Sequence, residues 1–432
     1  MSFIEELRWR GLIHDLISGT EEYLNEHKVS GYLGVDPTGN SMHIGNMVPV
    51  MMMVHLQRHG HYPVLLVGGA TARVGDPSGK DAERPLMSAE QVDANAAAIR
   101  DQLARFMDFE TPENPARMVN NYDWFQGIGF LDFLRDVGKH ITISYMMGKE
   151  SVKKRIASDS GLSYTEFAYQ LLQGYDFLHL YENEGVKLQV GGSDQWGNIT
   201  TGTELIRRKL GHEEKAFAVV CPLLTGATGA KLGKTAGGKN VWLDPERTTP
   251  YEFYQYWLGL SDEDVIKCAK IFSLKDRETL ETMIATHHED PARRQLHSQL
   301  AEELTERLHG TEGLENAKLM TDFFFGRIKS KEALQKLNAK QWTEVAKASD
   351  LKTLTKADIA EGIGVLNLLT QIGATSSNGE ARRAIEKDKS VKVNMEAITD
   401  SNATIQTSDL FFDRYLFLQK GKKNKFIIEI SE

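Results

Sequence analysis

The residues with the clearest chemical potential form two short motifs far apart in the sequence. The first covers residues 34–46 and reads GVDPTGNSMHIGN. An apolar run ends at Asp36, turn-forming residues follow, and His43 stands at the expected start of a helix, where free backbone N–H groups and the helix dipole attract phosphate. Gly34 and Gly45 would let a nucleotide approach the backbone closely. The pattern favours a nucleotide site over a glycine-rich turn with a surface histidine.

The second motif is KLGKT at residues 231–235, inside a glycine-rich stretch. Two lysines three positions apart in a loop can close on a triphosphate as point charges. The stretch is not a P-loop, because that pattern needs glycine where Thr228 stands, and no GxGxxG motif indicates a dinucleotide enzyme. On its own this motif is equally compatible with a flexible surface loop.

The elements that must position these motifs show an alternating pattern. Apolar runs at residues 31–35, 64–69 and 188–192 are each followed by a helical pattern, which predicts a parallel α/β sheet. Ligands bind at the carboxyl ends of the strands in such sheets, so we expect the chemistry in the loops after these runs.

Four regions are expected along the chain. Residues 1–249 should form a Rossmann-like catalytic domain, and residues 250–326 a helical domain. In the latter, leucines recur on one helical face and end at Gly310; they are Leu296, Leu300, Leu304 and Leu308. The polar, lysine-rich segment 327–350 indicates a linker. Residues 351–432 should form a small α/β module, with strand-like runs at 391–394 and 426–430.

Composition limits the class of protein. The 432 residues are 41% hydrophobic and carry a net charge of -9, which argues against indiscriminate coating of nucleic acid but not against a local RNA site. Two cysteines, Cys221 and Cys268, cannot build a disulfide framework or a structural zinc site, and no HExxH pattern is present. The N-terminus lacks a signal-peptide pattern, so we expect a cytoplasmic protein with no membrane span and no protein-bound zinc.

Together the two motifs resemble the signatures of class I aminoacyl-tRNA synthetases: HIGN at 43–46 is similar to HIGH, and KLGKT at 231–235 to KMSKS. Three further segments resemble the bacterial-type tyrosyl members: VGGATARVGDPSGK at 67–80, NNYDW at 120–124 and GGSDQWGNI at 191–199. The resemblance covers essentially the whole chain, and the last module resembles the S-four-type RNA-binding fold.

The resemblance implies a tyrosine pocket. Tyr32 and Asp176 would bind the phenol, which needs both a donor and an acceptor when buried. Asp76, Tyr169 and Gln173 would bind the ammonium group, and Gln195 would lie near the carboxylate. Without the resemblance, the four-residue spacing of Tyr169 and Gln173 would indicate only an ordinary helix face.

The resemblance also implies ATP as a substrate, Mg²⁺ arriving with ATP rather than in a dedicated metal site, tyrosine tRNA as the second substrate, and a homodimer with residues 130–147 in its interface. The residues expected on the nucleotide side are Gly34, Asp36, Thr38, His43, Gly45, Gly192, Asp194, Lys231 and Lys234. The expected catalytic set is Thr38, His43, Asn46, Lys231, Lys234 and Thr235. Asn46 replaces the second histidine of HIGH and keeps a side-chain N–H donor of shorter reach.

Two rival interpretations remain at this point. A tryptophanyl enzyme is nearest in fold, but an indole offers only a donor to the pair Tyr32 and Asp176. A non-catalytic RNA-binding relative would not need both lysines, His43 and the complete substrate set.

Overall fold

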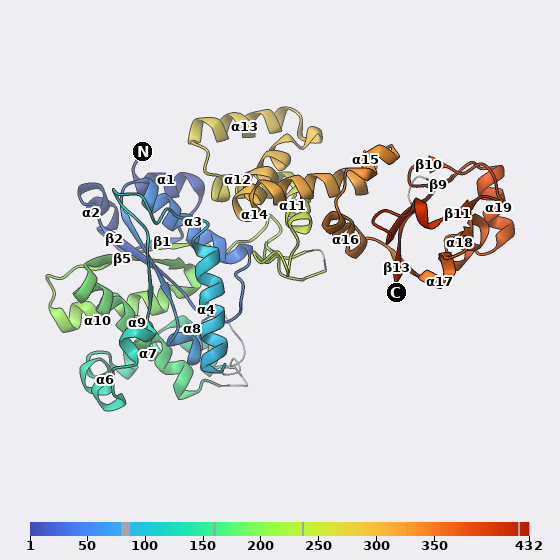
Figure 1. Ribbon diagram of the computed structural model, residues 1–432. Helices are drawn as coiled ribbons and strands as arrows, with labels where there is room; N and C mark the ends of the chain where they lie inside the picture. Colours follow the sequence, from blue (N-terminus) through green and yellow to red (C-terminus); the bar gives the residue numbers. More distant parts are fainter. Residues whose placement is uncertain (79–86, 159–160, 236, 326, 422–423, 432) are drawn as a thin grey trace. The chain divides into compact units, whose positions relative to one another are not determined.

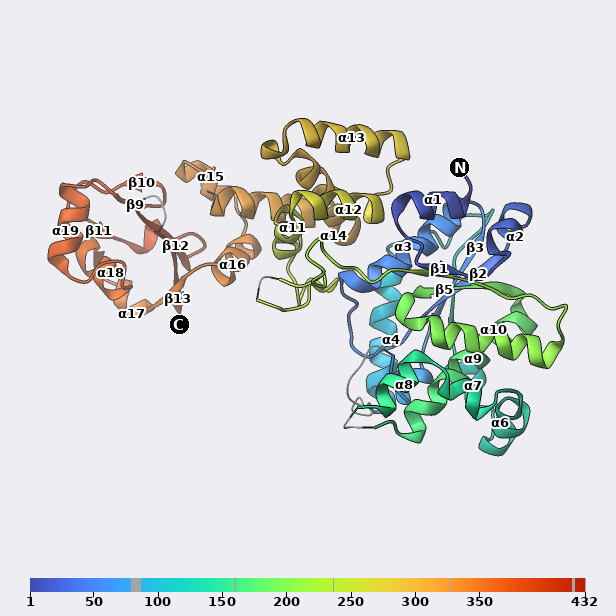
Figure 2. The ribbon, with the colours of Figure 1, turned by 180° about the vertical axis from the view of Figure 1, so that it is seen from behind.

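The computed structural model describes residues 1–78, 87–158, 161–235, 237–325, 327–421 and 424–431. The chain divides into two compact units, Met1–Leu314 and Glu315–Glu432. Figures 1 and 2 show the elements of both units from opposite sides. Within the described residues, no helix combines the length and the apolar character needed to cross a membrane.

The first unit is built on a six-stranded sheet with the order β1-β6-β5-β2-β3-β4. The strands are β1 (Asp15–Leu16), β2 (Ser30–Val35), β3 (Tyr62–Val67), β4 (Arg117–Asn120), β5 (Val186–Gly192) and β6 (Phe217–Cys221). All neighbours are parallel except β1 and β6, which confirms the predicted parallel α/β fold. The strand order reverses between β2 and β5, and ligands of open parallel sheets bind at such a point.

Helices surround this sheet, and the longest of them lies beside the reversal point. The helices and 3-10 turns before residue 250 are α1 (Phe3–Arg10), α2 (Thr20–Glu26), α3 (Ile44–Arg58), η1 (Thr71–Arg73), α4 (Ala89–Leu103), α5 (Tyr122–Phe125), α6 (Phe130–Asp136), η2 (Gly138–His140), α7 (Ile143–Met147), α8 (Glu150–Ile156), α9 (Tyr164–Glu184), η3 (Ser193–Gln195) and α10 (Trp196–Leu210). Tyr32, Val64 and Leu66 pack with α9 and α10 in one buried cluster. Because side chains alternate along a strand, this places Tyr32 on the face that α9 covers.

A helical region completes the first unit. It contains α11 (Pro250–Leu258), α12 (Asp262–Phe272), α13 (Arg277–Glu289), η4 (Pro291–Arg293) and the first part of α14 (Gln295–Phe324). The predicted leucine face is confirmed, since Leu296, Leu300, Leu304 and Leu308 are each at most 2% exposed. Gly310 interrupts α14 with a φ of 72°, a conformation that glycine adopts without strain.

The second unit contains a five-stranded sheet ordered β10-β9-β12-β13-β7 and a two-stranded sheet of β8 and β11. Its elements after α14 are α15 (Lys331–Gln335), α16 (Ala339–Lys347), β7 (Leu351–Thr355), α17 (Lys356–Ile359), β8 (Ile363–Gly364), α18 (Val365–Gln371), α19 (Asn378–Glu386), β9 (Val391–Val393), β10 (Glu396–Ala397), β11 (Thr404–Ile405), η5 (Thr407–Asp409), β12 (Tyr415–Lys420) and β13 (Asn424–Ser431). The two runs expected to be strands correspond to β9 and β13.

The segment expected to be a linker, residues 327–350, is instead part of this second unit. It carries α15 and α16, and Trp342 of α16 is fully buried. The Trp342 ring stacks on Phe411 and Tyr415 at centroid distances of 4.7 and 5.9 Å. The segment is polar on average, but α16 is an amphipathic helix whose buried apolar side chains are three and four positions apart.

Candidate active site

The residues expected at the strand ends meet at one edge of the first sheet. Asp36 directly follows β2, and Gly192 ends β5. The two oxygens of Asp36 accept hydrogen bonds from Thr71 Oγ1 at 2.6 Å and from the Tyr169 hydroxyl at 2.7 Å. A Cβ at Gly68 would lie 2.0 Å from Asp36 Oδ1, so a glycine is required beside this carboxylate.

Tyr32 and Asp176 form a buried polar pair at the reversal point of the sheet. Tyr32 on β2 is 1% exposed, and its hydroxyl has no hydrogen-bond partner among the described residues. Asp176 on α9 is 2% exposed and accepts from Asn121 Nδ2 at 3.1 Å and from Trp124 Nε1 at 3.0 Å. Burial raises the pKa of both groups, while the two N–H donors lower the pKa of Asp176. The pair therefore has the capacity to bind one more polar group.

A second cluster of polar groups is joined through the buried side chain of Asn198. Asp76 accepts from Gln195 Nε2 at 2.7 Å, from the Ser78 backbone N–H at 2.9 Å and from Asn198 Nδ2 at 3.3 Å. Asn198 Nδ2 also lies 3.0 Å from Gln173 Oε1. The structure thus brings together three of the residues that the sequence assigned to the ammonium and carboxylate of an amino acid.

The two sequence motifs lie against each other, although almost two hundred residues separate them. A Cβ at Gly233 would lie 3.5 Å from the Gly45 backbone nitrogen. The backbone N–H of Ile44 donates to the Val241 carbonyl at 3.1 Å, and the N–H of Val241 donates to the Gly233 carbonyl at 2.8 Å. Gly233 has a φ of 88°, so this contact depends on a conformation that other residues rarely adopt.

The N-terminus of α3 has the predicted position but an unexpected cap. His43 is the N-cap residue, and its backbone N–H donates to Asn46 Oδ1 at 3.0 Å. The side-chain oxygen of Asn46 therefore stabilises the helix end, and its amide N–H group is what it can offer to a ligand. A Cβ at Gly45 would lie 2.9 Å from the His43 ring, so Gly45 allows this ring position.

The remaining nucleotide-side residues are accessible to solvent. Gly34 and Thr38 are exposed, as are Asp194 and the three polar residues of the second motif, Lys231, Lys234 and Thr235. The Asp194 side chain lies against Gly192, since a Cβ at Gly192 would be 2.6 Å from Asp194 Oδ1. The cationic side chains of the second motif are thus free to meet an anion that enters from solvent.

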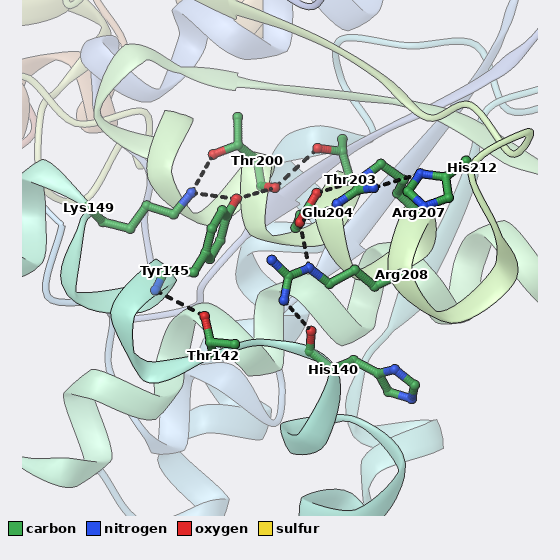
Figure 3. A network of polar contacts seen from close by, with 10 residues as sticks. All are labelled: His140, Thr142, Tyr145, Lys149, Thr200, Thr203, Glu204, Arg207, Arg208 and His212. Carbon is green, nitrogen blue, oxygen red and sulfur yellow. Dashed lines mark hydrogen bonds and ion pairs between the residues drawn. The ribbon is translucent and has the colours of Figure 1, made fainter.

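A polar network ties α7 and Lys149, the N-cap residue of α8, to α10 (Figure 3). The first turn of α10 also contributes Asn198. Lys149 Nζ donates to the Tyr145 hydroxyl and to Thr200 Oγ1, both at 2.8 Å. Arg208 donates to Glu204 at 2.5 Å and to the His140 carbonyl at 3.0 Å. Burial lowers the pKa of Lys149 to about 8. The network fixes α10 relative to the segment before α8 and so supports the polar cluster.

Four supporting residues were not predicted as site residues: Thr71, Asn121, Trp124 and Asn198. All four lie within the three segments that resemble the tyrosyl enzymes. The available signal was the presence of hydrogen-bonding side chains in motifs next to the strand ends. Sequence alone could not show which partner each one holds, because those partners lie far away in the chain.

Comparison with known proteins identifies the family. A sequence model described as tRNA synthetases class I (W and Y) matches residues 24–326, and one for the C-terminal domain of tyrosine–tRNA ligases matches residues 345–428. The chain belongs to the class I tRNA synthetases of the tryptophan and tyrosine group. The second match begins inside α16, ahead of the position predicted for the last module.

Individual members of the family are similar over the whole chain. The tyrosine–tRNA ligase of Porphyromonas gingivalis is 50% identical over 437 residues, with 100% of both chains covered. That of Bacteroides fragilis is 49% identical over 432 residues, with 99% of both covered. Among solved structures of synthetases, the C-terminally truncated mitochondrial tyrosyl enzyme of Aspergillus nidulans has 31% identity and a TM-score of 0.67, and the match covers 75% of this chain and 94% of that chain.

Proposed function

We propose that this chain is a tyrosine–tRNA ligase, which activates tyrosine with ATP and esterifies it to the 3′-terminal adenosine of its tRNA. One observation carries the choice of tyrosine: the buried Tyr32 hydroxyl has no partner among the described residues, beside an Asp176 held by two N–H donors. A phenol supplies the missing donor and acceptor in one group. An indole supplies only a donor and would leave one member of the pair unsatisfied.

The second polar cluster suits the charged end of the amino acid. The Tyr169 hydroxyl donates its hydrogen to Asp36, so its oxygen can accept from an ammonium group. Asp76 and Gln173 Oε1 supply two further acceptors, which matches the three N–H donors of an ammonium. Gln195, hydrogen-bonded to Asp76, would orient the carboxylate toward ATP.

The first reaction joins a tyrosine carboxylate oxygen to the α-phosphorus of ATP and releases pyrophosphate. The nucleophile is ionised at neutral pH, so the step needs no general base, and catalysis is positioning and charge stabilisation. Lys231, Lys234 and Thr235 would hold the leaving pyrophosphate, with His43 and Thr38 on the opposite motif. Asn46 would contribute its amide N–H. Mg²⁺ would arrive on the phosphates of ATP, whose oxygens this hard cation prefers.

The remaining nucleotide contacts would come from the loops after the strands. Gly34 and Gly45 would allow the nucleotide to approach the backbone, while Asp36, Gly192 and Asp194 would line the ribose side. In the second reaction a ribose hydroxyl of the tRNA attacks the acyl carbon, and AMP leaves. The second unit would bind this tRNA, and α19 presents Arg382 and Arg383 to solvent there.

A homodimer through residues 130–147 is part of the proposal. Phe130, Leu131 and Ile143 are 65%, 77% and 64% exposed, an unusual density of apolar surface on short helices. A second copy would cover this surface in a self-complementary contact. Replacing Leu131 with aspartate should increase the monomer fraction in analytical ultracentrifugation, and an unchanged sedimentation coefficient would remove residue 131 from the interface.

ATP–pyrophosphate exchange tests the proposed function. Labelled pyrophosphate should be incorporated into ATP when tyrosine is added, and should not be when tryptophan is added. In a separate aminoacylation assay, the protein should charge tyrosine tRNA with tyrosine. Exchange that depends on another amino acid would overturn the choice of substrate. Full-length protein with no exchange for any amino acid, but with tRNA binding, would support the non-catalytic alternative.

A further inference from the structure

We propose that Asp262, His287 and His297 form a binding site for a divalent transition-metal cation of the Zn²⁺ type. One ligand atom from each side chain lies within 4.8 Å of the others. The three residues belong to the helical region of the first unit, and none of them is assigned a part in tyrosine activation. The proposal therefore adds a site that the synthetase reaction does not require.

The ligand atoms come from three helix ends that converge. Asp262 is the first residue of α12, His287 lies in the last turn of α13, and His297 lies in the first turn of α14. Asp262 Oδ1 is 3.2 Å from His287 Nε2. Ligand atoms bound tetrahedrally to zinc are about 3.3 Å apart, given bond lengths of about 2.0 Å. Small side-chain rotations would thus bring the set to coordination geometry.

Each of the two imidazoles has a ring nitrogen without the hydrogen bond that buried histidines normally make. His287 and His297 are 2% and 0% exposed. Nδ1 of His287 and Nδ1 of His297 have no hydrogen-bond partner among the described residues, and the polar group beside His287 Nε2 is the Asp262 carboxylate at 3.2 Å. Unsatisfied buried polar groups are unfavourable, so a cation that accepts their lone pairs would stabilise this arrangement.

The surroundings of the cluster fit a metal site. His297 Nε2 lies 3.0 Å from the Leu260 carbonyl, and when Nε2 donates to that carbonyl the lone pair stands on Nδ1. Metal-binding histidines commonly donate their other N–H to a backbone carbonyl. The Asp262 side chain is 55% exposed, which gives a cation access and leaves room for water ligands.

The donor set selects the class of cation. Two imidazoles and one carboxylate are ligands that suit zinc and neighbouring first-row metals, whereas magnesium and calcium prefer oxygen ligands alone. The sequence predicted no protein-bound zinc because it contains only two cysteines and no HExxH. The proposed ligands form no such sequence pattern, because they come from three separate helices with no short spacing between them.

Titration of the nucleotide-free full-length chain with Co²⁺ tests the proposal, with visible absorption and calorimetry as readouts and Zn²⁺ as the competitor. The parent should bind one equivalent at this site. Asp262→Asn, at an exposed position that does not threaten folding, should weaken binding about tenfold or more. His287→Gln should abolish it.

Two neighbouring exposed residues provide matched controls. Glu263→Gln and His288→Gln should bind Co²⁺ as the parent does. Added Zn²⁺ should raise the melting temperature of the parent and of both controls, should raise that of Asp262→Asn less, and should leave that of His287→Gln unchanged. The proposal is overturned if the parent shows no saturable binding, or if Asp262→Asn and His287→Gln retain parental affinity. Loss of binding in His288→Gln alone would place the cation on surface histidines and would also overturn it.

Discussion

Replacement of Tyr32 by phenylalanine should have opposite effects on the unliganded protein and on its use of tyrosine. The Tyr32 hydroxyl is buried without a partner among the described residues, and such a group costs about 1 to 3 kcal/mol. Its removal should leave the free protein as stable as the parent or more stable. With tyrosine bound, the same change removes one neutral hydrogen bond, about 0.5 to 1.5 kcal/mol, which lowers kcat/KM about 2- to 13-fold.

The assay pairs thermal melting without ligands with tyrosine-dependent ATP–pyrophosphate exchange. Tyr169→Phe is the matched control, because this second buried tyrosine donates to Asp36 at 2.7 Å. Its loss removes a charge-assisted hydrogen bond, so Tyr169→Phe should lower both the melting temperature and kcat/KM. A Tyr32→Phe protein that melts well below the parent, with unchanged kcat/KM for tyrosine, would show that the Tyr32 hydroxyl does not bind the substrate.

Three further predictions concern the charge on the leaving group, the tyrosine pocket and the second unit. Lys234→Ala should slow adenylate formation in pre-steady-state kinetics and leave the Kd for tyrosine nearly unchanged, because the lost contact is to pyrophosphate; equal losses in both would contradict the role. Trp124→Phe removes a donor that lowers the pKa of Asp176, so the pH profile of kcat/KM for tyrosine should shift to higher pH, and an unshifted profile would count against this. A chain without Glu315–Glu432 should still form adenylate but should charge tRNA poorly. A chain that ends at Asp350 should instead aggregate, as measured by light scattering, because it keeps α16 without the strands that cover its apolar face.

Much of the first unit was predictable because local pattern and tertiary role agree there. The apolar runs form β2, β3 and β5. Because parallel strands have their carboxyl ends at one edge of a sheet, Asp36 and Gly192 lie at the same edge. The leucine face of α14 was predictable for the same reason, since apolar residues that recur with the 3.6-residue period of a helix form its buried face.

The rest depends on contacts between distant residues. Asn198 and Asn121 are polar and buried, and only the fold shows that they hold Gln173 and Asp176. Residues 327–350 were predicted to be a linker because lysines dominate their composition, whereas Trp342 and Val345 carry the helical period that predicts burial. In this segment the spacing of apolar residues predicts the buried helix, whereas the average polarity does not.

In the proposed site, Tyr32 and Asp176 bind the phenol of tyrosine. The most direct test of this role is kcat/KM for tyrosine and for phenylalanine in the parent and in Asp176→Ala, measured by ATP–pyrophosphate exchange. Phenylalanine leaves both buried groups unpaired, so the parent should strongly prefer tyrosine, and Asp176→Ala should lose most of its tyrosine use together with that preference. An Asp176→Ala protein that rejects phenylalanine as strongly as the parent does would contradict this role.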